Sequence, residues 1–263
     1  MLLLLDIGNT RTHVGLAAGR RLWPLGDIPT EDWSDRSASR RLRRLVGRAP
    51  VRAASMCSVV PHATSRVRET VEGFWDVRAF VLTPRTVRGV GIKYSKPETI
   101  GPDRLANAVA ARHFFGAPAV VVDFGTAVTF DVIDRRGDYI GGIIAPGLAA
   151  MTSYLHEKTA LLPRIRIREV RRVIGRSTEE AMLVGAVHGY RGLVRELIGE
   201  LKRELGARRL PVVATGGYAA LMASGLPEIS AVKPQLTLEG LRRAWELQAH
   251  GGGEGSGPVG GRP

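Results

Sequence analysis

Apolar residues occur along the chain in short runs that end at polar turns, and one such run begins the sequence. The run Met1–Leu5 is followed by a polar turn that starts at Asp6, and a second apolar stretch covers Thr12–Leu16. Five residues are too few for a membrane span, which needs about 20, or for a signal peptide, which needs a basic start and a longer apolar core. The pattern therefore predicts a buried strand, a turn and a second strand.

The same pattern returns in the second half, in AVVVDFGTAVTFDVID from Ala119 onward. Asp6 corresponds to Asp123, and Gly8 corresponds to Gly125. Each half also contains a later strand that leads into a helix, at residues 51–71 and 210–223. Two similar halves of this kind predict a duplicated α/β domain with a cleft between the halves.

The predicted domains are an N-terminal lobe, residues 1–115, and a C-terminal lobe, residues 116–248. The remaining segment, 249–263, is rich in glycine and has too few apolar groups to offset the entropy of ordering, so we expect a disordered tail. A long helix is predicted at about 178–205, with an apolar face rich in alanine and glycine. That face suits either ordinary core packing or the seam of a dimer.

The charge balance of +13, from 38 basic and 25 acidic residues, is unusual for a chain of 263 residues. Such an excess is found in nucleic-acid-binding proteins, but it also follows from arginine spread over the whole surface. The densest cluster, Arg40–Arg48, has Leu42 and Leu45 at helical spacing, which favours a solvated helix face over a polyanion site. The single cysteine, Cys57, excludes an intrachain disulfide and a cysteine metal cluster. With no targeting segment apparent, we expect a cytoplasmic protein that binds neither nucleic acid nor membrane.

The candidate functional residues are three aspartates in glycine-containing turns: Asp6, Asp103 and Asp123. A carboxylate at a strand end beside a Gly/Asn/Thr turn can hold a metal ion or lie next to amides that bind phosphate; a tight hairpin with a solvated aspartate accounts for the first turn equally well. A glycine pair in Thr215–Leu221 would let a backbone approach a nucleotide, or make a plain turn. The sequence has no GxxxxGK[ST], and its GxGxxG, Gly255–Gly260, lies in the glycine-rich tail with no apolar run before it, which argues against a P-loop kinase and a Rossmann dehydrogenase. Together the turns indicate a phosphoryl-transfer site.

Several motifs together resemble the type III pantothenate kinases, a family of the acetate and sugar kinase, Hsp70 and actin superfamily. They occur in the family's order over residues 2 to about 241: DIGNTRTHVGL, GPDRLANAVAA, VVDFGTAVTFDVI, GGIIAPGLAAM, KTALLP, IGRSTEEAMLVGAVHGY, ATGGYAAL and LTLEGL. One departure is Val128, where the family commonly has a second threonine, whereas Thr126 and Asp131 are kept. The resemblance implies two ribonuclease H-like (actin-like ATPase) domains with an interdomain cleft. It also implies ATP-dependent phosphorylation of pantothenate to 4′-phosphopantothenate, the first step of coenzyme A biosynthesis.

The resemblance implies roles for particular residues. Asp103 is the base that accepts the proton of the attacking hydroxyl, a role compatible with capping a helix. Asp6 lies near a divalent cation, with magnesium expected, and Asp123 lies at the site of a monovalent cation, potassium or ammonium. The ATP-binding positions are Asp6, Ile7, Gly8, Asn9, Thr10, Arg11, Thr12, His13 and Thr126. The pantothenate-binding positions are Tyr94, Gly101, Pro102, Asp103, Arg104 and Thr178, with Thr178 reaching across from the second subunit of a homodimer.

Three other interpretations compete with this one. Another kinase or phosphatase of the same superfamily would act on a sugar or an acyl phosphate, and GPDR and DFGTA argue against it. A non-enzymatic regulatory relative should have lost its catalytic aspartate, which this chain keeps. A basic nucleic-acid-binding protein should show DNA or RNA affinity that falls steeply with salt.

Overall fold

The computed structural model describes residues 1–35 and 37–251, and these form two compact units. The first unit comprises residues 1–110 and the C-terminal segment from Thr237, and the second comprises residues 111–236. These units differ from the predicted lobes chiefly because the last helix belongs to the first unit. No helix in the described part of the chain has the length and apolar character needed to cross a membrane.

The first unit is built on a mixed sheet with the strand order β3-β2-β1-β4-β5. Strand β1 is antiparallel to β2 and parallel to β4. The strands of this unit are β1 (Leu2–Ile7), β2 (Arg11–Ala18), β3 (Arg21–Pro29), β4 (Ala53–Ser58), β5 (Ala79–Val81) and the short β6 (Gly91–Ile92). The helices are α1 (Ser37–Val46), α2 (Pro61–Trp75), α3 (Pro102–Phe115, which begins here), α8 (Leu236–Gly251) and the 3-10 turns η1 (Thr30–Ser34) and η2 (Pro97–Thr99).

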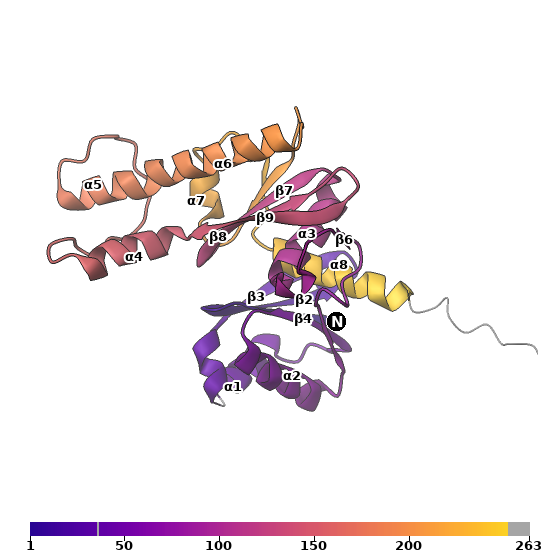
Figure 1. Cartoon of the computed structure of the whole chain (residues 1–263). Coiled ribbons are helices and arrows are strands. Elements are labelled where there is room, and N and C mark those ends of the chain that lie inside the picture. Colours follow the sequence, from indigo (N-terminus) through magenta and orange to yellow (C-terminus); the bar gives the residue numbers. More distant parts are fainter. Residues whose placement is uncertain (36, 252–263) are drawn as a thin grey trace, which may run out of the picture. The chain divides into compact units, whose positions relative to one another are not determined.

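The two faces of this sheet are covered by different helices (Figure 1). Leu3, Leu5 and Ile7 of β1 belong to a core that also contains residues of α1 and α2. Because side chains alternate along a strand, Asp6 points to the opposite face. On that face the hydroxyl of Ser55 in β4 donates a 3.1 Å hydrogen bond to the carbonyl of Leu241 in α8. Asp6 therefore lies on the face of the sheet that α8 covers.

Helix α8 is held against α3. The hydroxyl of Thr237 donates to Oδ1 of Asn107 at 2.9 Å, and both residues are buried. A Cβ at Gly240 would overlap the carbonyl of Ala106, so only glycine allows this close approach. This packing explains why the chain's last helix is part of the first unit. Helix α8 continues to Gly251, so residues 249–251 of the predicted tail are helical, and residues 252–263 lie outside the described part.

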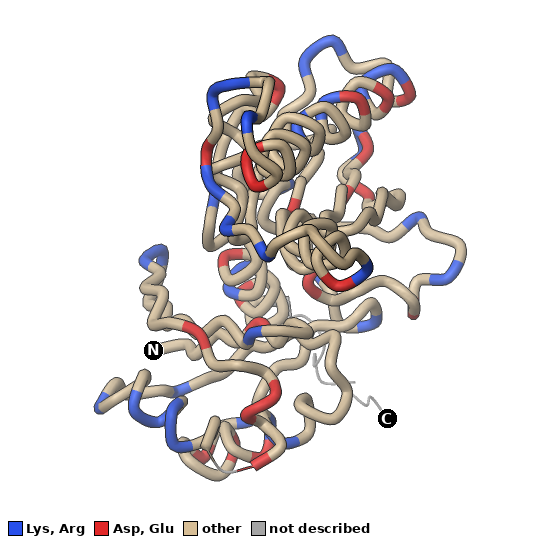
Figure 2. Tube along the Cα trace, turned by 90° about the vertical axis from the view of Figure 1, so that its left-hand side faces the viewer, with Lys and Arg blue, Asp and Glu red and all other residues tan. Residues whose placement is uncertain are grey.

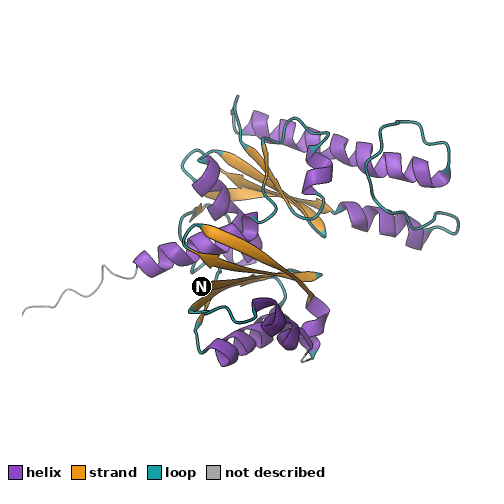
Figure 3. Ribbon diagram, turned by 180° about the vertical axis from the view of Figure 1, so that it is seen from behind, coloured by secondary structure: helices purple, strands orange, loops and turns teal. Residues whose placement is uncertain are grey.

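The second unit repeats the strand pattern of the first. Its own strands follow the order β9-β8-β7-β10-β11, with β7 antiparallel to β8 and parallel to β10. The strands are β7 (Ala119–Phe124), β8 (Ala127–Ile133), β9 (Asp138–Pro146), β10 (Val212–Thr215) and β11 (Ala231–Val232). Figure 3 shows the sheet and the helices of each unit. The predicted duplication of an α/β domain is confirmed.

The helices of the second unit are α4 (Leu148–Lys158), α5 (Thr178–Val184), α6 (Tyr190–Glu204) and α7 (Ala219–Ala223). A π-helical turn, Gly185–Gly189, separates α5 from α6, where the sequence predicted one continuous helix. Ala186 and Val187 of this turn are buried in the core of their own unit, as the core-packing interpretation expects. The hydroxyl of Tyr190, the first residue of α6, donates to the carbonyl of Pro146 at 2.9 Å.

Candidate active site

The first acidic turn joins β1 to β2 and is held closed from within its own unit. Asp6 is half-buried near the end of β1. The amide of Gly8 donates to the carbonyl of Arg11 at 3.0 Å, and the Gly8 carbonyl accepts a 2.7 Å hydrogen bond from the Thr30 hydroxyl. Asn9 at the tip is exposed. The turn is thus a fixed platform with an exposed tip, as a phosphate-binding turn needs to be.

Asp6 belongs to a row of polar side chains that crosses the sheet. It lies opposite His13 of β2 and opposite Cys57 of β4, and His13 lies opposite Asp27 of β3. His13 Nδ1 is 2.7 Å from Asp27 Oδ1, and an Arg11 guanidinium nitrogen is 3.6 Å from Asp27 Oδ2. Both basic side chains are therefore oriented by Asp27, a residue that the sequence analysis did not single out.

Two of the predicted ATP-binding residues have side chains that point into the core. Ile7 is fully buried. Thr12 is also buried, and its hydroxyl accepts a 2.9 Å hydrogen bond from the Trp33 indole and lies 3.3 Å from the Thr30 hydroxyl. These two residues could contact a nucleotide only through their backbone.

Asp103 is fixed at the start of α3. The amide of Arg104 donates to its Oδ1 at 2.9 Å, and the same amide donates to the carbonyl of Gly101 at 3.0 Å. A Cβ at residue 101 would overlap Oδ1 of Asp103, so glycine is needed for the carboxylate to occupy this position. Burial raises the pKa of Asp103, although the amide and the charge of Arg104 partly offset this effect. A carboxylate with a raised pKa accepts a proton more readily than an ordinary aspartate.

Cys57 is a buried thiol in contact with Asp6, one of the two candidate carboxylates of the first unit. Its thiol donates a 3.3 Å hydrogen bond to Asp6 Oδ1. Burial first, and then the negative charges of Asp6 and Asp103, raise the pKa of the Cys57 thiol well above its ordinary value. The structure thus brings Asp6 and Asp103 near one buried group. The sequence analysis missed this role because a single sequence does not show the register between β1 and β4.

The second acidic turn joins β7 to β8. Asp123 lies opposite Thr215 of β10, and the amide of Gly125 donates to the carbonyl of Ala127 at 3.1 Å. Gly216 follows β10 with a φ of +89°, and a Cβ there would lie 2.5 Å from Asp123 Oδ1. Gly216 therefore lets the backbone pass directly against the carboxylate. Thr126, predicted to bind phosphate, is exposed in the same turn.

The other predicted pantothenate-binding residues lie in different parts of the chain. Tyr94 is 38% exposed and follows β6. Thr178 is exposed at the first position of α5, after Ser177, whose hydroxyl accepts a 3.2 Å hydrogen bond from the amide of Glu180. Their role in binding pantothenate stays a prediction, as does a common cleft for the two acidic turns.

The described residues contain no group of three or more His, Cys, Asp or Glu side chains suited to hold a metal ion by themselves. Magnesium in phosphoryl-transfer sites usually keeps several waters and is bound by one or two carboxylates together with substrate phosphates. The single carboxylate of Asp6 beside the turn fits that mode of binding.

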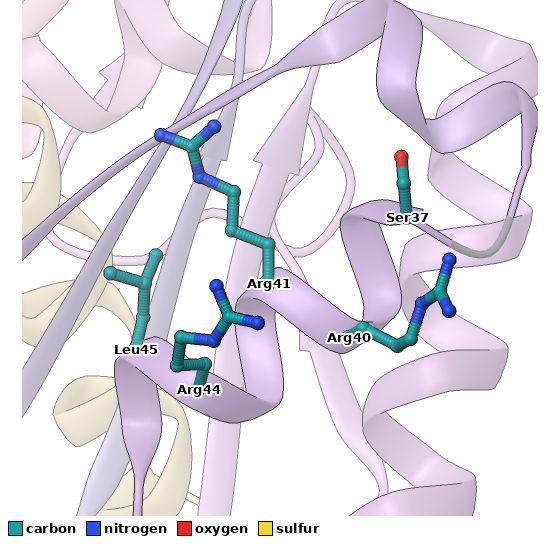
Figure 4. Close-up of a pocket in the computed structure, with 5 residues that line it drawn as sticks. All are labelled: Ser37, Arg40, Arg41, Arg44 and Leu45. Atoms are coloured by element: carbon teal, nitrogen blue, oxygen red, sulfur yellow. The ribbon is translucent and has the colours of Figure 1, made fainter.

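A hollow beside α1 is lined by Ser37, Arg40, Arg41, Arg44 and Leu45 (Figure 4). Helix α1 covers the face of the sheet opposite to Asp6 and Cys57, so this hollow is separate from the carboxylates. Basic residues also occur on many other segments of the chain (Figure 2). Their spread is what a generally basic surface would show.

Two sheets with the same strand order, each with an aspartate near the end of its first strand, define an actin-like ATPase fold. Solved structures share this fold at low sequence identity. A protein from Campylobacter jejuni described as a Baf family transcriptional activator has a TM-score of 0.55 at 16% identity, over 94% of this chain and 99% of its own. The activator of the 2-hydroxyisocaproyl-CoA dehydratase from Clostridium difficile, solved with bound ADPNP, has a TM-score of 0.50 at 11% identity, over 98% and 99%.

Sequence comparison identifies the family within this fold. The family model for type III pantothenate kinase matches residues 2–200. A type III pantothenate kinase from Akkermansia muciniphila is 50% identical over 243 residues, which are 92% of this chain and 97% of the relative. Another from Methylacidiphilum infernorum is 45% identical over 247 residues, covering 94% and 88%. The chain belongs to the type III pantothenate kinase family.

Proposed function

We propose that this chain transfers the γ-phosphoryl group of ATP to the 4′-hydroxyl of pantothenate, the first step of coenzyme A biosynthesis. The observation that carries the proposal is that this member of the family has Asp6 next to the β1–β2 turn, in contact with Cys57, and Asp103 held at the start of α3. Phosphoryl transfer needs a group that positions the phosphates and a separate carboxylate that orients the nucleophile. The first unit supplies one residue of each kind.

Asp103 is the base in this proposal. The hydroxyl oxygen of pantothenate forms a bond to the γ-phosphorus, and the bond between that phosphorus and the β–γ bridging oxygen breaks. The hydroxyl proton passes to Asp103, and ADP leaves with the electrons of the broken bond. Burial of Asp103 raises its pKa, which favours acceptance of this proton. The hydrogen bond from the Arg104 amide keeps one carboxylate oxygen in a constant orientation.

The β1–β2 turn binds the nucleotide phosphates in this proposal. Magnesium, when bound, neutralises phosphate charge, and Asp6 is the residue of the first unit that would hold it. Arg11 and His13 are exposed cationic or hydrogen-bonding side chains next to the turn, and both are oriented by Asp27. Thr126 of the second unit is the corresponding phosphate-binding residue in the β7–β8 turn.

Arg104 and the residues around it bind pantothenate. A guanidinium group can form two parallel hydrogen bonds with a carboxylate, and pantothenate carries one. Arg104 follows Asp103 directly, so the same helix start would fix the substrate's charged end and the base. Tyr94, Gly101, Pro102 and Thr178 complete the proposed binding residues.

Asp123 holds a monovalent cation, potassium or ammonium, in this proposal. Its carboxylate is half-buried near the end of β7 with the backbone of Gly216 against it. Hard cations prefer carboxylate and backbone carbonyl oxygens. The cation would help to offset phosphate charge.

The active form is proposed to be a cytoplasmic homodimer. Large apolar side chains are exposed on α4 and on the segment that follows it: Met151, Tyr154, Leu155, Leu161, Val173 and Ile174. Leu161 is 90% exposed. Exposed large apolar side chains gathered in one part of the sequence support an interaction site there, because contiguous apolar patches mark such sites. A second copy of the chain, with Thr178 close by in sequence, is the proposed partner.

A coupled assay of the purified chain with ATP, magnesium and pantothenate, run with and without potassium, tests the proposed function. A panel of other hydroxylated acceptors distinguishes it from the other kinases of this fold.

A further inference from the structure

Cys57 is a fully buried thiol in the first unit with a defined polar partner. It lies directly beside Asp6 in the parallel β1–β4 pair, and its Sγ is 3.3 Å from Asp6 Oδ1. An ionised carboxylate can only accept hydrogen bonds, so the thiol is the donor. The contact points a hydrogen at the oxygen of Asp6 from inside the protein.

The strand arrangement makes this contact rigid. Both residues lie within hydrogen-bonded strands at the centre of the five-stranded sheet. The neighbouring residue on the same face of β4, Ser55, is anchored to α8 through the carbonyl of Leu241. The backbone pairing of β1 with β4 is independent of this anchor and leaves Cys57 little freedom to move away from Asp6, so the Asp6 carboxylate is approached from one side by a fixed donor.

We infer that Cys57 is a positioning residue, whose thiol orients the Asp6 carboxylate for the magnesium-bound phosphates of the nucleotide. This inference rests on the proposed function, because that function assigns Asp6 to the magnesium–nucleotide complex. Groups that hydrogen-bond to a metal-binding side chain typically change metal affinity by about 10- to 100-fold when removed. A thiol is a weak donor, so the expected effect lies at the lower end, about tenfold.

The test compares Cys57→Ser, which keeps a donor, with Cys57→Val, which removes the donor and fills the buried space with a somewhat larger apolar side chain. The matched control is Ser55→Ala, which removes a buried hydrogen bond from the same strand face without touching Asp6. Two quantities are measured for each protein. One is the magnesium concentration that gives half-maximal activity; the other is the calorimetric affinity for a non-hydrolysable ATP analogue, with magnesium and with EDTA.

Cys57→Val should raise the half-maximal magnesium concentration about tenfold and weaken binding of the analogue only when magnesium is present. For Cys57→Ser, the half-maximal magnesium concentration and the affinity for the analogue should both stay within about twofold of the wild-type values. Ser55→Ala should lower the unfolding midpoint but leave the magnesium dependence unchanged. Equal magnesium dependence in Cys57→Val and the wild type would overturn the inference, even if pantothenate is phosphorylated normally.

If the proposed function is wrong, the result differs from a failure of the role of Cys57. The wild-type chain would then turn over no pantothenate, while calorimetry would still report whether magnesium-dependent nucleotide binding responds to Cys57. If Cys57→Val does not fold, the comparison of Cys57→Ser with Cys57→Ala decides the question. A magnesium dependence that Ala shifts and Ser does not supports the role, and equal values for both variants contradict it.

Discussion

The backbone amide of Arg104 donates a 2.9 Å hydrogen bond to Oδ1 of Asp103, the proposed base. The residue that would bind the substrate's carboxylate thus also fixes the residue that would accept its proton. Gly101 completes the arrangement, because a side chain at that position would displace the same oxygen. The proposed base, the proposed substrate-binding arginine and the glycine that makes room for the carboxylate therefore all lie at the start of α3.

Asp103→Asn should lower kcat for pantothenate by at least about 100-fold, the usual range for loss of a general base being about 10²–10⁴. Asparagine has nearly the same size and can still cap the helix, but it cannot accept the proton. The affinity for ATP should change by less than about twofold, because Asp103 is outside the nucleotide turns. Steady-state kinetics and calorimetry measure both quantities, and a near-normal kcat would leave Asp103 as a helix cap only.

The free energy of unfolding of Asp103→Asn provides a control, because the direction of its change can be predicted from the pKa of Asp103. The folded-state pKa of Asp103 is raised by burial, so folding favours its protonated form. The contribution of this group to stability is therefore present below its ordinary pKa and is lost as pH rises through the folded value. At pH 7 the buried charge costs stability, and Asp103→Asn should unfold at the same urea concentration as the wild type or a higher one. A lower midpoint would show that the charged carboxylate stabilises the fold.

Activity should depend on potassium or ammonium through Asp123. We expect Asp123→Asn to raise the half-saturating potassium concentration by about tenfold or more, with the half-saturating magnesium concentration unchanged as the internal control. Initial rates in potassium, sodium and choline chloride at matched ionic strength measure the effect. Equal wild-type rates in the three salts would show that Asp123 does not act through a bound potassium or ammonium ion.

The exposed apolar surface of α4 should be covered in a homodimer. Tyr154 is 61% exposed, and Tyr154→Glu should convert the dimer to a monomer because it places a charge in an apolar contact. Phe74→Glu, at an exposed apolar residue of α2, is the matched control and should leave the dimer intact. Sedimentation velocity distinguishes the two states. A wild-type chain that is monomeric and fully active at assay concentration would contradict this prediction.

The ion pair between Glu169 and Arg191 should stabilise the second unit in a pH-dependent way. Two guanidinium nitrogens of Arg191 lie 3.0 and 2.7 Å from the Glu169 carboxylate oxygens. These hydrogen bonds lower the pKa of Glu169 to about 2. The contribution is thus fully present above the ordinary pKa of about 4.5 and is lost as pH falls toward 2.

Glu169→Gln should therefore destabilise the chain by about 1 kcal/mol at pH 7, since the carboxylate is half in water. The difference from the wild type should shrink between about pH 4.5 and pH 2, as urea unfolding at several pH values would show. In an Arg191→Met background the same substitution should have almost no effect. A difference that is constant with pH would mean that the pair does not stabilise through the charge of Glu169.

The sequence predicts the parts of this molecule that depend on local pattern. Apolar runs ending at Asp6 and Asp123 predicted the two first strands and their turns, and the capping preference of Asp103 agrees with its place at the start of α3. Relations between distant segments were not predictable in this way. The register that sets Cys57 beside Asp6 and the pair of Glu169 with Arg191 depend on tertiary packing, which leaves no periodic signal in one sequence.

The position of the last helix illustrates the same distinction. The helix itself was not predicted from the sequence, and its place in the first unit depends on Thr237 meeting Asn107 and on Gly240 meeting Ala106. The π-helical turn at Gly185–Gly189 was also not predicted. Glycines at its two ends accommodate the extra residue per turn, and such a turn has no distinct pattern in the sequence.

Identification of the reaction product is the decisive test of whether this chain phosphorylates pantothenate. The purified chain is incubated with ATP, magnesium, potassium and pantothenate, and the product is examined by mass spectrometry and phosphorus NMR. We expect one ADP for each 4′-phosphopantothenate, with the phosphate on the 4′-hydroxyl and a rate at least about 100-fold lower for Asp103→Asn. No phosphorylated pantothenate, or a higher kcat/KM for a sugar or acyl acceptor, would contradict it.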